Sequence, residues 1–347
     1  MILLSPQAGC WYRIVETLGG GGMADVYRCS LVRSDGLPAS AQFAVKVLRE
    51  AWDGENVLRF SEEAHLLRRL RHPYLVPAIQ VHLEHYPPYY VMPVMKETLA
   101  EHLAGMKPRN ELYRAKYALE HFLLPVCSAA LYLHSRKIWH RDIKPQNIFL
   151  DSAGKPRLGD LSICHWSRPF PFERTWCGMG TRGYTAPETL QTGTASPQSD
   201  IYSLGVVFYE IITGRLPAYY WWNRAGNRPS VQHPRSCHPH VDELLVRMTH
   251  PDPGLRYTSV ADTMRDMRLL TDVYLPSLPL YRRVPPPPRV PEPPPNVYAL
   301  LAGLKNPSPA QSPYPSGYLA ALLGSPPTPP AYQSGYLAAL LAQAARK

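Results

Sequence analysis

The chain has few cysteines for its 347 residues, and none of them forms the pairs that common metal sites need. Six cysteines occur, and no two stand in a C-x-x-C arrangement, which argues against a zinc site. They are also too scattered for the disulfide framework of a small secreted domain, so a reducing compartment is expected.

Long hydrophobic runs are absent as well. The longest nearly apolar segment, residues 201–212, is shorter than the roughly 20 residues that a membrane-spanning helix requires. The apolar start of the chain, residues 1–4, is followed at once by Ser5-Pro6-Gln7 and lacks the basic flank of a signal peptide. Together with the cysteines, these absences predict a cytoplasmic protein without a membrane span.

Runs of like charge are missing, although the chain is basic overall. Its 37 Lys and Arg against 27 Asp and Glu give a formal charge of +10, and no five like charges are consecutive. Half of this excess lies in the last fifth of the chain. Without a concentrated basic patch, a solvated surface is favoured over a nucleic-acid interface, and no nucleic-acid partner is expected.

Proline is plentiful but unevenly distributed. Of 39 prolines, 18 fall in the 72 residues from Pro276 to Lys347. Proline has a fixed φ angle and no backbone donor, so a segment this rich in proline cannot form a regular helical or sheet core. Glycine shows no three-residue period, which excludes collagen. We therefore expect a disordered tail over residues 276–347.

The tail carries internal repeats. The segment Ser316 to Leu323 recurs as Ser334 to Leu341, and residues 297–302 form a looser copy. Each copy is long enough for about two helical turns, which are marginal alone in water. Two interpretations stay open: docking motifs that fold on a partner or on another copy of the chain, or duplicated sequence without a role. Membrane binding is disfavoured because the repeats carry no basic face.

The body of the chain begins with strand patterns and continues with helical ones. Short strands are predicted over residues 12–18, 25–31, 42–48, 79–83 and 89–94, with an amphipathic helix over 57–70. Helices are predicted over 113–135 with a kink at Pro125, and over 200–213, 241–249 and 259–271. Strands followed by helices indicate an α+β protein of two lobes, with the seam at residues 92–97.

Short motifs with chemical meaning follow one another in this body. Residues 18–27 (LGGGGMADVY) place a glycine-rich turn between two strands, where backbone amides can approach phosphate oxygens. By itself such a turn is equally typical of an ordinary hairpin. Lys46 ends the AVK motif on the third strand, which runs beside that turn.

The most specific motif is the segment 140–147 (HRDIKPQN), directly before a strand-like segment. Its Asp142 can accept a hydroxyl proton, Lys144 can neutralise a phosphoryl oxygen, and Asn147 can hold Mg²⁺. Asp160 in the DLS motif supplies a second carboxylate for the metal. The APE motif, which ends at Glu188, closes a loop rich in Ser, Thr and Gly.

In this order the motifs resemble the eukaryotic-like (Hanks-type) Ser/Thr protein kinases, from about Trp11 to Leu270. The GGMADVY turn and the closing Arg256-Tyr257 are most similar to the bacterial branch. The resemblance implies a bilobal kinase fold over residues 11–272, with a β-rich N-lobe at about 11–92 and a mainly helical C-lobe at about 97–272. It also implies transfer of the ATP γ-phosphoryl group to Ser and Thr of protein substrates, with Mg²⁺ or Mn²⁺ as cofactor.

The resemblance assigns the nucleotide and metal ligands residue by residue. Lys46 would bind the α- and β-phosphates and pair with a helix glutamate, which is Glu63 in the better register and Glu62 otherwise. The ATP-binding set is Leu18, Gly19, Gly20, Gly21, Gly22, Val26, Ala44, Lys46, Glu63, Met92 as gatekeeper, Pro93 and Met95 as hinge contacts, Asn147 and Asp160. Asn147 and Asp160 would also hold the metal.

Catalytic, structural and regulatory roles are implied in the same way. Asp142 would accept the substrate proton and Lys144 would steady the γ-phosphate. Glu188 and Arg256 match a buried ion pair, and Asp200 matches the acid at the start of the central helix. Arg141 would pair with a phosphate on the activation segment, for which Thr175 is the preferred autophosphorylation site; an unmodified loop threonine is the alternative. Thr181 would contact the catalytic Asp and select Ser/Thr substrates.

Two positions depart from the family pattern. Ala24 stands where the third glycine usually lies, and Leu161-Ser162 replace Phe-Gly after the metal-binding Asp160. Serine lacks the freedom of glycine at positive φ, so switching of this segment would be restricted. Because every residue that does chemistry is present, an active kinase is favoured over the alternative, a pseudokinase or ATP-binding scaffold that acts through its tail.

Overall fold

The computed structural model describes residues 4–7, 10–21, 23–33, 38–106, 111–161, 165–166, 183–217 and 238–275. Gly22, Thr175, Thr181 and the whole tail from residue 276 lie outside the described residues. The described chain divides into two compact units, the first comprising residues 4–69 and 77–94 and the second residues 70–76 and 95–275. Apart from residues 70–76, which belong to the second unit, the division along the chain falls between Val94 and Met95.

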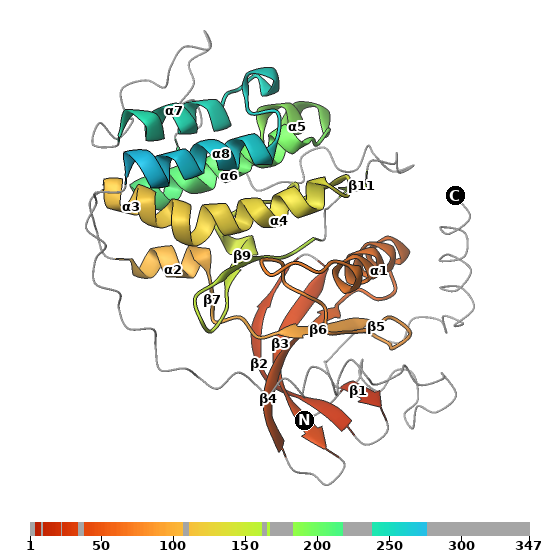
Figure 1. Ribbon diagram of the computed structural model, residues 1–347. Helices are drawn as coiled ribbons and strands as arrows, with labels where there is room; N and C mark the ends of the chain where they lie inside the picture. Colours follow the sequence, from red (N-terminus) through yellow and green to blue (C-terminus); the bar gives the residue numbers. More distant parts are fainter. Residues whose placement is uncertain are drawn as a thin grey trace. The chain divides into compact units, whose positions relative to one another are not determined.

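The first unit is an antiparallel sheet with one long helix (Figure 1). Its strands lie in the order β1-β2-β3-β4-β6-β5, and α1 follows β4 in the chain. Their bounds are β1 Leu4–Gln7, β2 Cys10–Gly20, β3 Ala24–Arg33, β4 Pro38–Leu48, α1 Gly54–Arg69, β5 Gln80–His82 and β6 Tyr89–Pro93. The predicted strands and helix are thus present, with longer strands at the glycine turn than expected.

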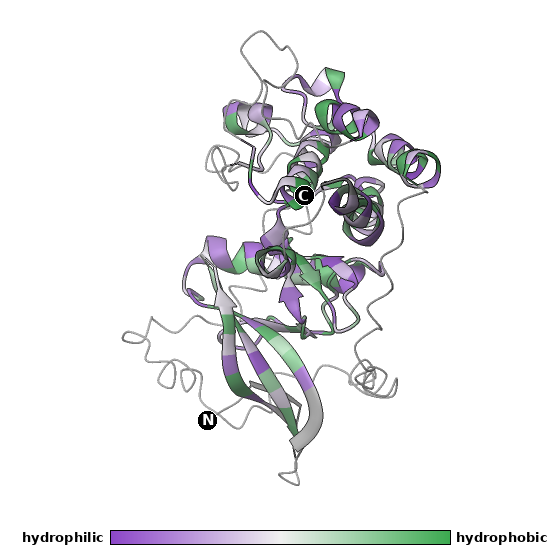
Figure 2. Ribbon diagram, turned by 90° about the vertical axis from the view of Figure 1, so that its left-hand side faces the viewer, coloured by the Kyte–Doolittle hydropathy of each residue, from purple (hydrophilic) through white to green (hydrophobic). Residues whose placement is uncertain are grey.

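Hydrophobic and hydrophilic residues alternate along the long strands of this sheet, as the colours in Figure 2 show. Successive side chains on a strand point to opposite faces, so the two faces of the sheet differ. One face forms a buried apolar core, made of Tyr12, Cys29, Leu31, Phe43, Val45, Val47, Tyr89 and Val91. The Tyr12 hydroxyl on β2 donates to Gln80 Oε1 on β5 at 2.7 Å. Three strands separate β2 from β5, a distance of about 19 Å in a flat sheet. The sheet therefore curls strongly around its apolar face.

The second unit is mainly helical (Figure 1). Its helices are α2 Leu99–Gly105, α3 Glu111–Ala118, α4 Leu124–His134, α5 Pro187–Thr192, α6 Pro197–Thr213, α7 Pro239–Met248 and α8 Val260–Leu269. Its short strands are β7 Glu97–Thr98, β8 Ile138–Trp139, β9 Ile148–Leu150, β10 Pro156–Leu158 and β11 His165–Trp166, paired as β10-β9-β7 and β11-β8. A β-rich first part and a helical second part confirm the predicted fold class.

The centre of the second unit is α6, which is buried on nearly all sides, as suits its mostly apolar sequence. Ser196 caps its first turn, and Gly214 ends it with a positive φ of 73°. A Cβ atom at Gly205 would lie 2.6 Å from Thr249 Cγ2 and 2.8 Å from Met248 Cβ. Glycine at this position therefore lets the end of α7 approach the backbone of α6 closely.

The predicted helix over residues 113–135 is divided by a π-helical turn, Leu119–Leu123, that joins α3 to α4. Pro125 stands in the first turn of α4. Proline has no backbone N–H, so it would interrupt the hydrogen bonds of a continuous α-helix at this point. The wider π turn, in which Leu124 N–H donates to Leu119 O, absorbs this interruption. None of the helices in the described ranges has both the length and the apolar character needed to cross a bilayer.

Candidate active site

In the first unit, a buried ion pair joins β4 to α1. Lys46 Nζ lies 2.9 Å from Glu63 Oε1 and 3.0 Å from Glu63 Oε2. The Glu63 side chain has no exposed surface, and the Tyr90 hydroxyl on β6 donates to its Oε1 at 3.0 Å. The pair expected from the sequence is therefore present in the Glu63 register, whereas Glu62 is exposed.

Residues predicted to bind nucleotide share the sheet face on which Lys46 lies. In the strand register Val26 pairs with Lys46, and Ala44 pairs with Met92. Side chains two residues apart on a strand point to the same side, so Ala44 and Lys46 share this face with their partners. Leu18, two residues before the end of β2, has 40 % of its surface exposed. The unit thus presents an apolar surface next to a lysine.

The glycine turn between β2 and β3 is closed by a hydrogen bond from Gly21 N–H to Ala24 O at 2.9 Å. A Cβ atom at Gly20 would lie 2.4 Å from Asp25 Oδ1, because the Asp25–Arg49 ion pair packs against the backbone there. At Gly19 and Gly21 a Cβ would meet nothing within 4 Å, so their backbone is open to approach. Ala24, the departure from the family pattern, is buried and contributes its carbonyl to the turn.

In the second unit, two polar residues of the HRDIKPQN segment, Lys144 and Asn147, converge on the carboxylate of a third, Asp142. Lys144 Nζ lies 2.7 Å from Asp142 Oδ2. Asn147 Nδ2 donates to Asp142 Oδ2 at 2.9 Å and to Asp142 O at 2.8 Å. Both bonds use the amide nitrogen of Asn147, so the orientation of its amide is set and Oδ1 is the atom left for a cation.

A second buried carboxylate, Asp200 at the start of α6, holds the backbone of this segment. Asp200 accepts hydrogen bonds from His140 N–H at 2.8 Å and Arg141 N–H at 2.9 Å, and its Oδ2 lies 2.8 Å from His134 Nε2. Burial by itself would raise the pKa of Asp200, but the contacts from His134 and His140 hold it below its ordinary value. Arg141 adopts a φ of 70°, a conformation that these bonds keep in place.

Asp200→Asn is expected to destabilise the second unit by about 2–4 kcal/mol, because an amide cannot accept from three donors as a carboxylate does. Because the pKa of Asp200 is lowered in the folded state, the contribution of its carboxylate to the free energy of unfolding is complete above the unfolded-state pKa of about 3.9. That contribution is lost only as the pH falls below this value. Urea denaturation should therefore give the same difference in the free energy of unfolding between Asp200→Asn and wild type at pH 8 and at pH 6. A difference that shrinks between these values would contradict this assignment.

The segment that carries Asp160 is bound to the same network. Gly159 N–H donates to Asn147 O at 2.9 Å, and Gly159 O lies 3.1 Å from His140 Nε2. A Cβ at Gly159 would lie 2.9 Å from Phe149 and Val76, so only glycine fits. Asp160 follows with a φ of 59°, and Leu161 is buried. Leucine thus fills an apolar position after Asp160. Ser162 lies outside the described residues.

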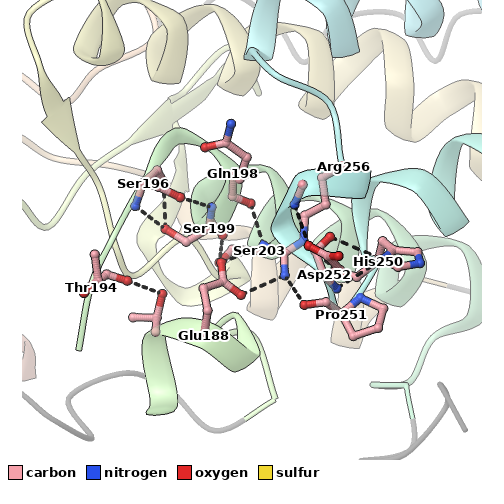
Figure 3. A network of polar contacts seen from close by, with 12 residues as sticks. Glu188, Thr194, Ser196, Gln198, Ser199, Ser203, His250, Pro251, Asp252 and Arg256 are labelled. Carbon is pink, nitrogen blue, oxygen red and sulfur yellow. Dashed lines mark hydrogen bonds and ion pairs between the residues drawn. The ribbon is translucent and has the colours of Figure 1, made fainter. Parts of the chain in front are cut away.

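A further ion pair, Glu188 with Arg256, connects α5 to the segment before α8 (Figure 3). Arg256 Nη1 and Nη2 donate to the two oxygens of Glu188 at 2.7 and 2.8 Å. The same guanidinium donates to the carbonyls of Gln198, Pro251 and His250, at 3.0, 3.1 and 2.6 Å. Every donor group of the buried Arg256 therefore has an acceptor, which is the condition under which a buried ion pair is stable.

The sequence of the chain matches the model of a known protein family. The family model described as "Protein kinase domain" matches residues 12–268, which is most of the chain. The chain belongs to the protein kinase family. This confirms the resemblance that the motifs indicated.

Curated bacterial kinases are similar to the chain over its kinase domain. Serine/threonine-protein kinase PrkC of Bacillus subtilis is 31 % identical over 282 residues, covering 78 % of this chain and 42 % of PrkC. Serine/threonine-protein kinase PknL of Mycobacterium tuberculosis is 30 % identical over 272 residues, covering 75 % of this chain and 66 % of PknL. The chain thus spans about two fifths of PrkC and just under two thirds of PknL.

The kinase family uses a divalent metal, and the donor set of this chain fits one. Across the described ranges, no three His, Cys, Asp or Glu side chains gather to hold a metal ion by themselves. Mg²⁺ needs few protein ligands when phosphate and water oxygens complete its octahedral shell. Asn147 Oδ1 and the Asp160 carboxylate are oxygen donors on two segments that a hydrogen bond joins, which suits such an ion.

Several supporting residues were not found from the sequence. His134 contacts Asp200 across 66 positions of sequence, and Tyr90 contacts Glu63 across 27. Neither residue type nor spacing marks them, because their partners are brought together only by packing. Asp200 itself was predicted as the acid at the start of the central helix, but its contacts with the catalytic segment were not. Within the predicted set, Gly22, Thr175 and Thr181 lie outside the described residues.

Proposed function

We propose that this chain is an active Ser/Thr protein kinase, which transfers the γ-phosphoryl group of ATP to Ser and Thr hydroxyls of proteins. The observation that carries the proposal is the cluster of Asp142, Lys144 and Asn147, in which a lysine and an amide orient one carboxylate. A carboxylate held in this way can accept the proton of a substrate hydroxyl, which is the chemistry that phosphoryl transfer needs from the protein.

In this proposal each member of the cluster has one task. Asp142 orients the hydroxyl and takes its proton as the oxygen attacks the γ-phosphorus. Lys144, 2.7 Å from Asp142 Oδ2, lies close enough to that carboxylate to place its charge near the transferred phosphoryl group. Asn147 fixes the carboxylate through Nδ2 and would hold the metal through Oδ1.

The first unit would supply the contacts to ATP. Lys46, oriented by Glu63, would bind the α- and β-phosphates, and the amides of the glycine turn would approach phosphate oxygens. The apolar face that includes Val26, Ala44 and Met92 suits a planar purine base. Pro93 would offer its carbonyl to the base, which its missing N–H does not prevent. Met95, the first residue of the second unit after the division along the chain, would offer its amide.

Asn147 and Asp160 would hold Mg²⁺, with Mn²⁺ as an alternative ion of the same coordination chemistry. When bound, the metal neutralises charge on the phosphate oxygens. Its presence is readily tested because a chelator removes it. We expect phosphoryl transfer to cease on addition of excess EDTA and to return when Mg²⁺ is restored.

Regulation, location and partners are further parts of the proposal. Arg141 would bind a phosphate on the activation segment, with Thr175 as its acceptor, while Thr181 would select hydroxyl substrates. We also propose that the protein acts in the cytoplasm, without nucleic-acid partners, and that the tail repeats dock on a partner or on another copy of the chain. The relatives' names support a Ser/Thr kinase and leave these points to experiment.

The direct test is an assay of the purified full chain with labelled ATP, Mg²⁺ and a general substrate such as myelin basic protein. Label on Ser or Thr of the substrate, lost with EDTA, is the expected result. If ATP binds but no label is transferred to any Ser or Thr, the chain acts as a non-catalytic scaffold and the proposal is wrong.

Glu63→Gln is expected to weaken the use of ATP, because Lys46 loses the charged partner that orients it. A hydrogen bond to a charged group contributes about 1.5–3 kcal/mol, which corresponds to a decrease in kcat/KM for ATP of about 10- to 100-fold. The matched control is Glu62→Gln, one residue away on α1 and exposed. Equal effects of the two substitutions would show that Glu63 has no special role.

A further inference from the structure

The glycine turn between β2 and β3 has an ion pair on one of its two sides. Asp25 is the second residue of β3, and Arg49 directly follows β4. Arg49 Nη2 lies 2.5 Å from Asp25 Oδ1, and Arg49 Nε donates to Asp25 Oδ2 at 3.1 Å. We propose that Asp25 and Arg49 are positioning residues for ATP, which hold the glycine turn in the shape that its amides need to reach the phosphates. This inference rests on the proposed function and deepens it, because it concerns the same nucleotide site.

The ion pair lies on the sheet face opposite to Lys46. Val26 pairs with Lys46 across β3 and β4, whereas its neighbour Asp25 pairs with Val47. Adjacent residues of a strand point to opposite faces, so Asp25 shares the face of Val47, which belongs to the buried apolar core. Arg49 follows Val47 by two residues and meets Asp25 on that side. Neither charged side chain therefore lies on the face proposed to bind the nucleotide, and an effect on ATP must pass through the turn.

The second glycine of the turn is fitted to this pair. Gly20 pairs with Asp25 across β2 and β3. A Cβ atom at Gly20 would lie 2.4 Å from Asp25 Oδ1 and 3.0 Å from Arg49 Nη2. The φ angle of Gly20 lies outside the left-handed region, so its backbone conformation by itself does not require glycine. Glycine at this position is therefore explained by the ion pair, which packs directly against the backbone of the turn.

The two neighbouring glycines have the opposite environment. A Cβ atom at Gly19 or at Gly21 would meet nothing within 4 Å. Gly19 pairs with Val26, which shares the face of Lys46. One side of the turn is thus open toward the proposed nucleotide face, while the other side is covered by the ion pair. This is the arrangement expected if the covered side supports the turn and the open side receives phosphate oxygens.

Arg49 also holds the turn through its backbone. Its N–H donates to Met23 O at 2.8 Å, and within the turn Gly21 N–H donates to Ala24 O at 2.9 Å. Glycine has no side chain to restrict it and loses more conformational freedom on ordering than any other residue. A turn that is already held before ATP arrives loses less of this freedom on binding, so the ion pair should raise the affinity for ATP.

The exposure of the pair limits the size of this effect. The side chains of Arg49 and Asp25 are 47 % and 25 % exposed. Water and salt screen such a pair, so exposed pairs change an equilibrium by about fivefold at most. Two parallel contacts between a guanidinium and a carboxylate are the stronger geometry, which favours the upper part of that range. Loss of the pair is therefore expected to raise the Kd for ATP by about two- to fivefold.

The experiment measures binding to the purified full chain by isothermal titration calorimetry. The ligands are the non-hydrolysable ATP analogue AMP-PNP with Mg²⁺, and adenosine, which lacks phosphates. In Asp25→Asn and in Arg49→Gln, the Kd for AMP-PNP should rise by about two- to fivefold, while the Kd for adenosine should stay at its wild-type value. An equal rise for adenosine would overturn the inference, because it would show general damage to the site.

A double variant tests whether the two residues act as one pair. Asp25→Asn/Arg49→Gln should weaken AMP-PNP binding no more than either single substitution does, since each removes the same interaction. Losses that add in the double variant would overturn the pairing of the two residues as the cause.

The matched control is a second exposed ion pair between the same two strands. Glu16 on β2 lies 2.9 Å from Arg28 on β3, three residues beyond Asp25, and both side chains are about as exposed as those of the pair at the turn. Glu16→Gln should leave the Kd values for AMP-PNP and adenosine unchanged. A rise for AMP-PNP equal to that of Asp25→Asn would show that the pair at the turn has no special role.

The wild-type chain separates this inference from the proposed function. If it phosphorylates myelin basic protein, but Asp25→Asn and Arg49→Gln bind AMP-PNP as tightly as wild type, this inference is wrong and the proposed function stands. If wild type binds AMP-PNP without transferring phosphate, the proposed activity is wrong, and the binding of the variants still decides the inference. If wild type neither binds AMP-PNP nor transfers phosphate, both fail.

Discussion

Asp142→Asn is expected to lower the rate of phosphoryl transfer by about 10²- to 10⁴-fold, the usual contribution of a positioned general base. Asparagine keeps the size of the side chain but cannot take a proton. Lys144, 2.7 Å from Asp142 Oδ2, also loses its charged partner. The hydrogen bonds to Asp200 come from the backbone of His140 and Arg141, so the variant should fold normally.

Initial rates of phosphate transfer to myelin basic protein measure this effect, and circular dichroism checks the fold. The matched control is Asp272→Asn, which removes an exposed carboxylate in the same unit and should leave the rate unchanged. Binding of ATP should change little in Asp142→Asn, because Asp142 acts on the substrate hydroxyl. A variant that transfers phosphate at the wild-type rate would exclude catalysis at this site.

Arg256→Ala is expected to destabilise the second unit by about 3–5 kcal/mol, the usual cost of leaving one partner of a buried ion pair alone. The substitution removes both bonds to Glu188 and the three bonds to the carbonyls of Gln198, His250 and Pro251 (Figure 3). The ion pair holds the short helix α5 in place, so we also expect the substitution to lower kinase activity.

Urea denaturation, monitored by circular dichroism, measures the loss in the free energy of unfolding of Arg256→Ala. The matched control is Arg265→Ala, because Arg265 also forms an ion pair, with Asp262 at 2.8 Å, but its side chain is 74 % exposed. Exposed pairs contribute about 0–1 kcal/mol, so this variant should stay close to wild type. Similar losses in the free energy of unfolding for both variants would show that the burial of Arg256 does not determine how much its ion pair stabilises the protein.

Local chemistry could be predicted from the sequence because it depends on residues that are close in the chain. Asp142, Lys144 and Asn147 lie within six positions, so their types and spacing by themselves indicate phosphoryl transfer. Glycine turns and the alternation of strand residues are equally local. For the same reason the order of strands and helices, and with it the fold class, followed from periodicity.

Contacts between distant segments could not be predicted in this way. The sequence left Glu62 and Glu63 as alternatives for Lys46, and the packing of α1 on the sheet selected Glu63. The curl that joins Tyr12 to Gln80 likewise has no local marker. Pro125 marked an irregularity in its helix, but not that a π turn would accommodate it.

The sequence by itself determined which groups could do the chemistry, since this depends on side-chain types at short spacing. Only the tertiary structure decided how those groups are held. Asp200 accepts hydrogen bonds from His140 and Arg141, about 60 residues away, and from His134, and these contacts hold the catalytic segment in its strained conformation. The reason is physical. A buried carboxylate must accept hydrogen bonds from donors that lie near it in the folded structure, and those donors can come from any part of the sequence.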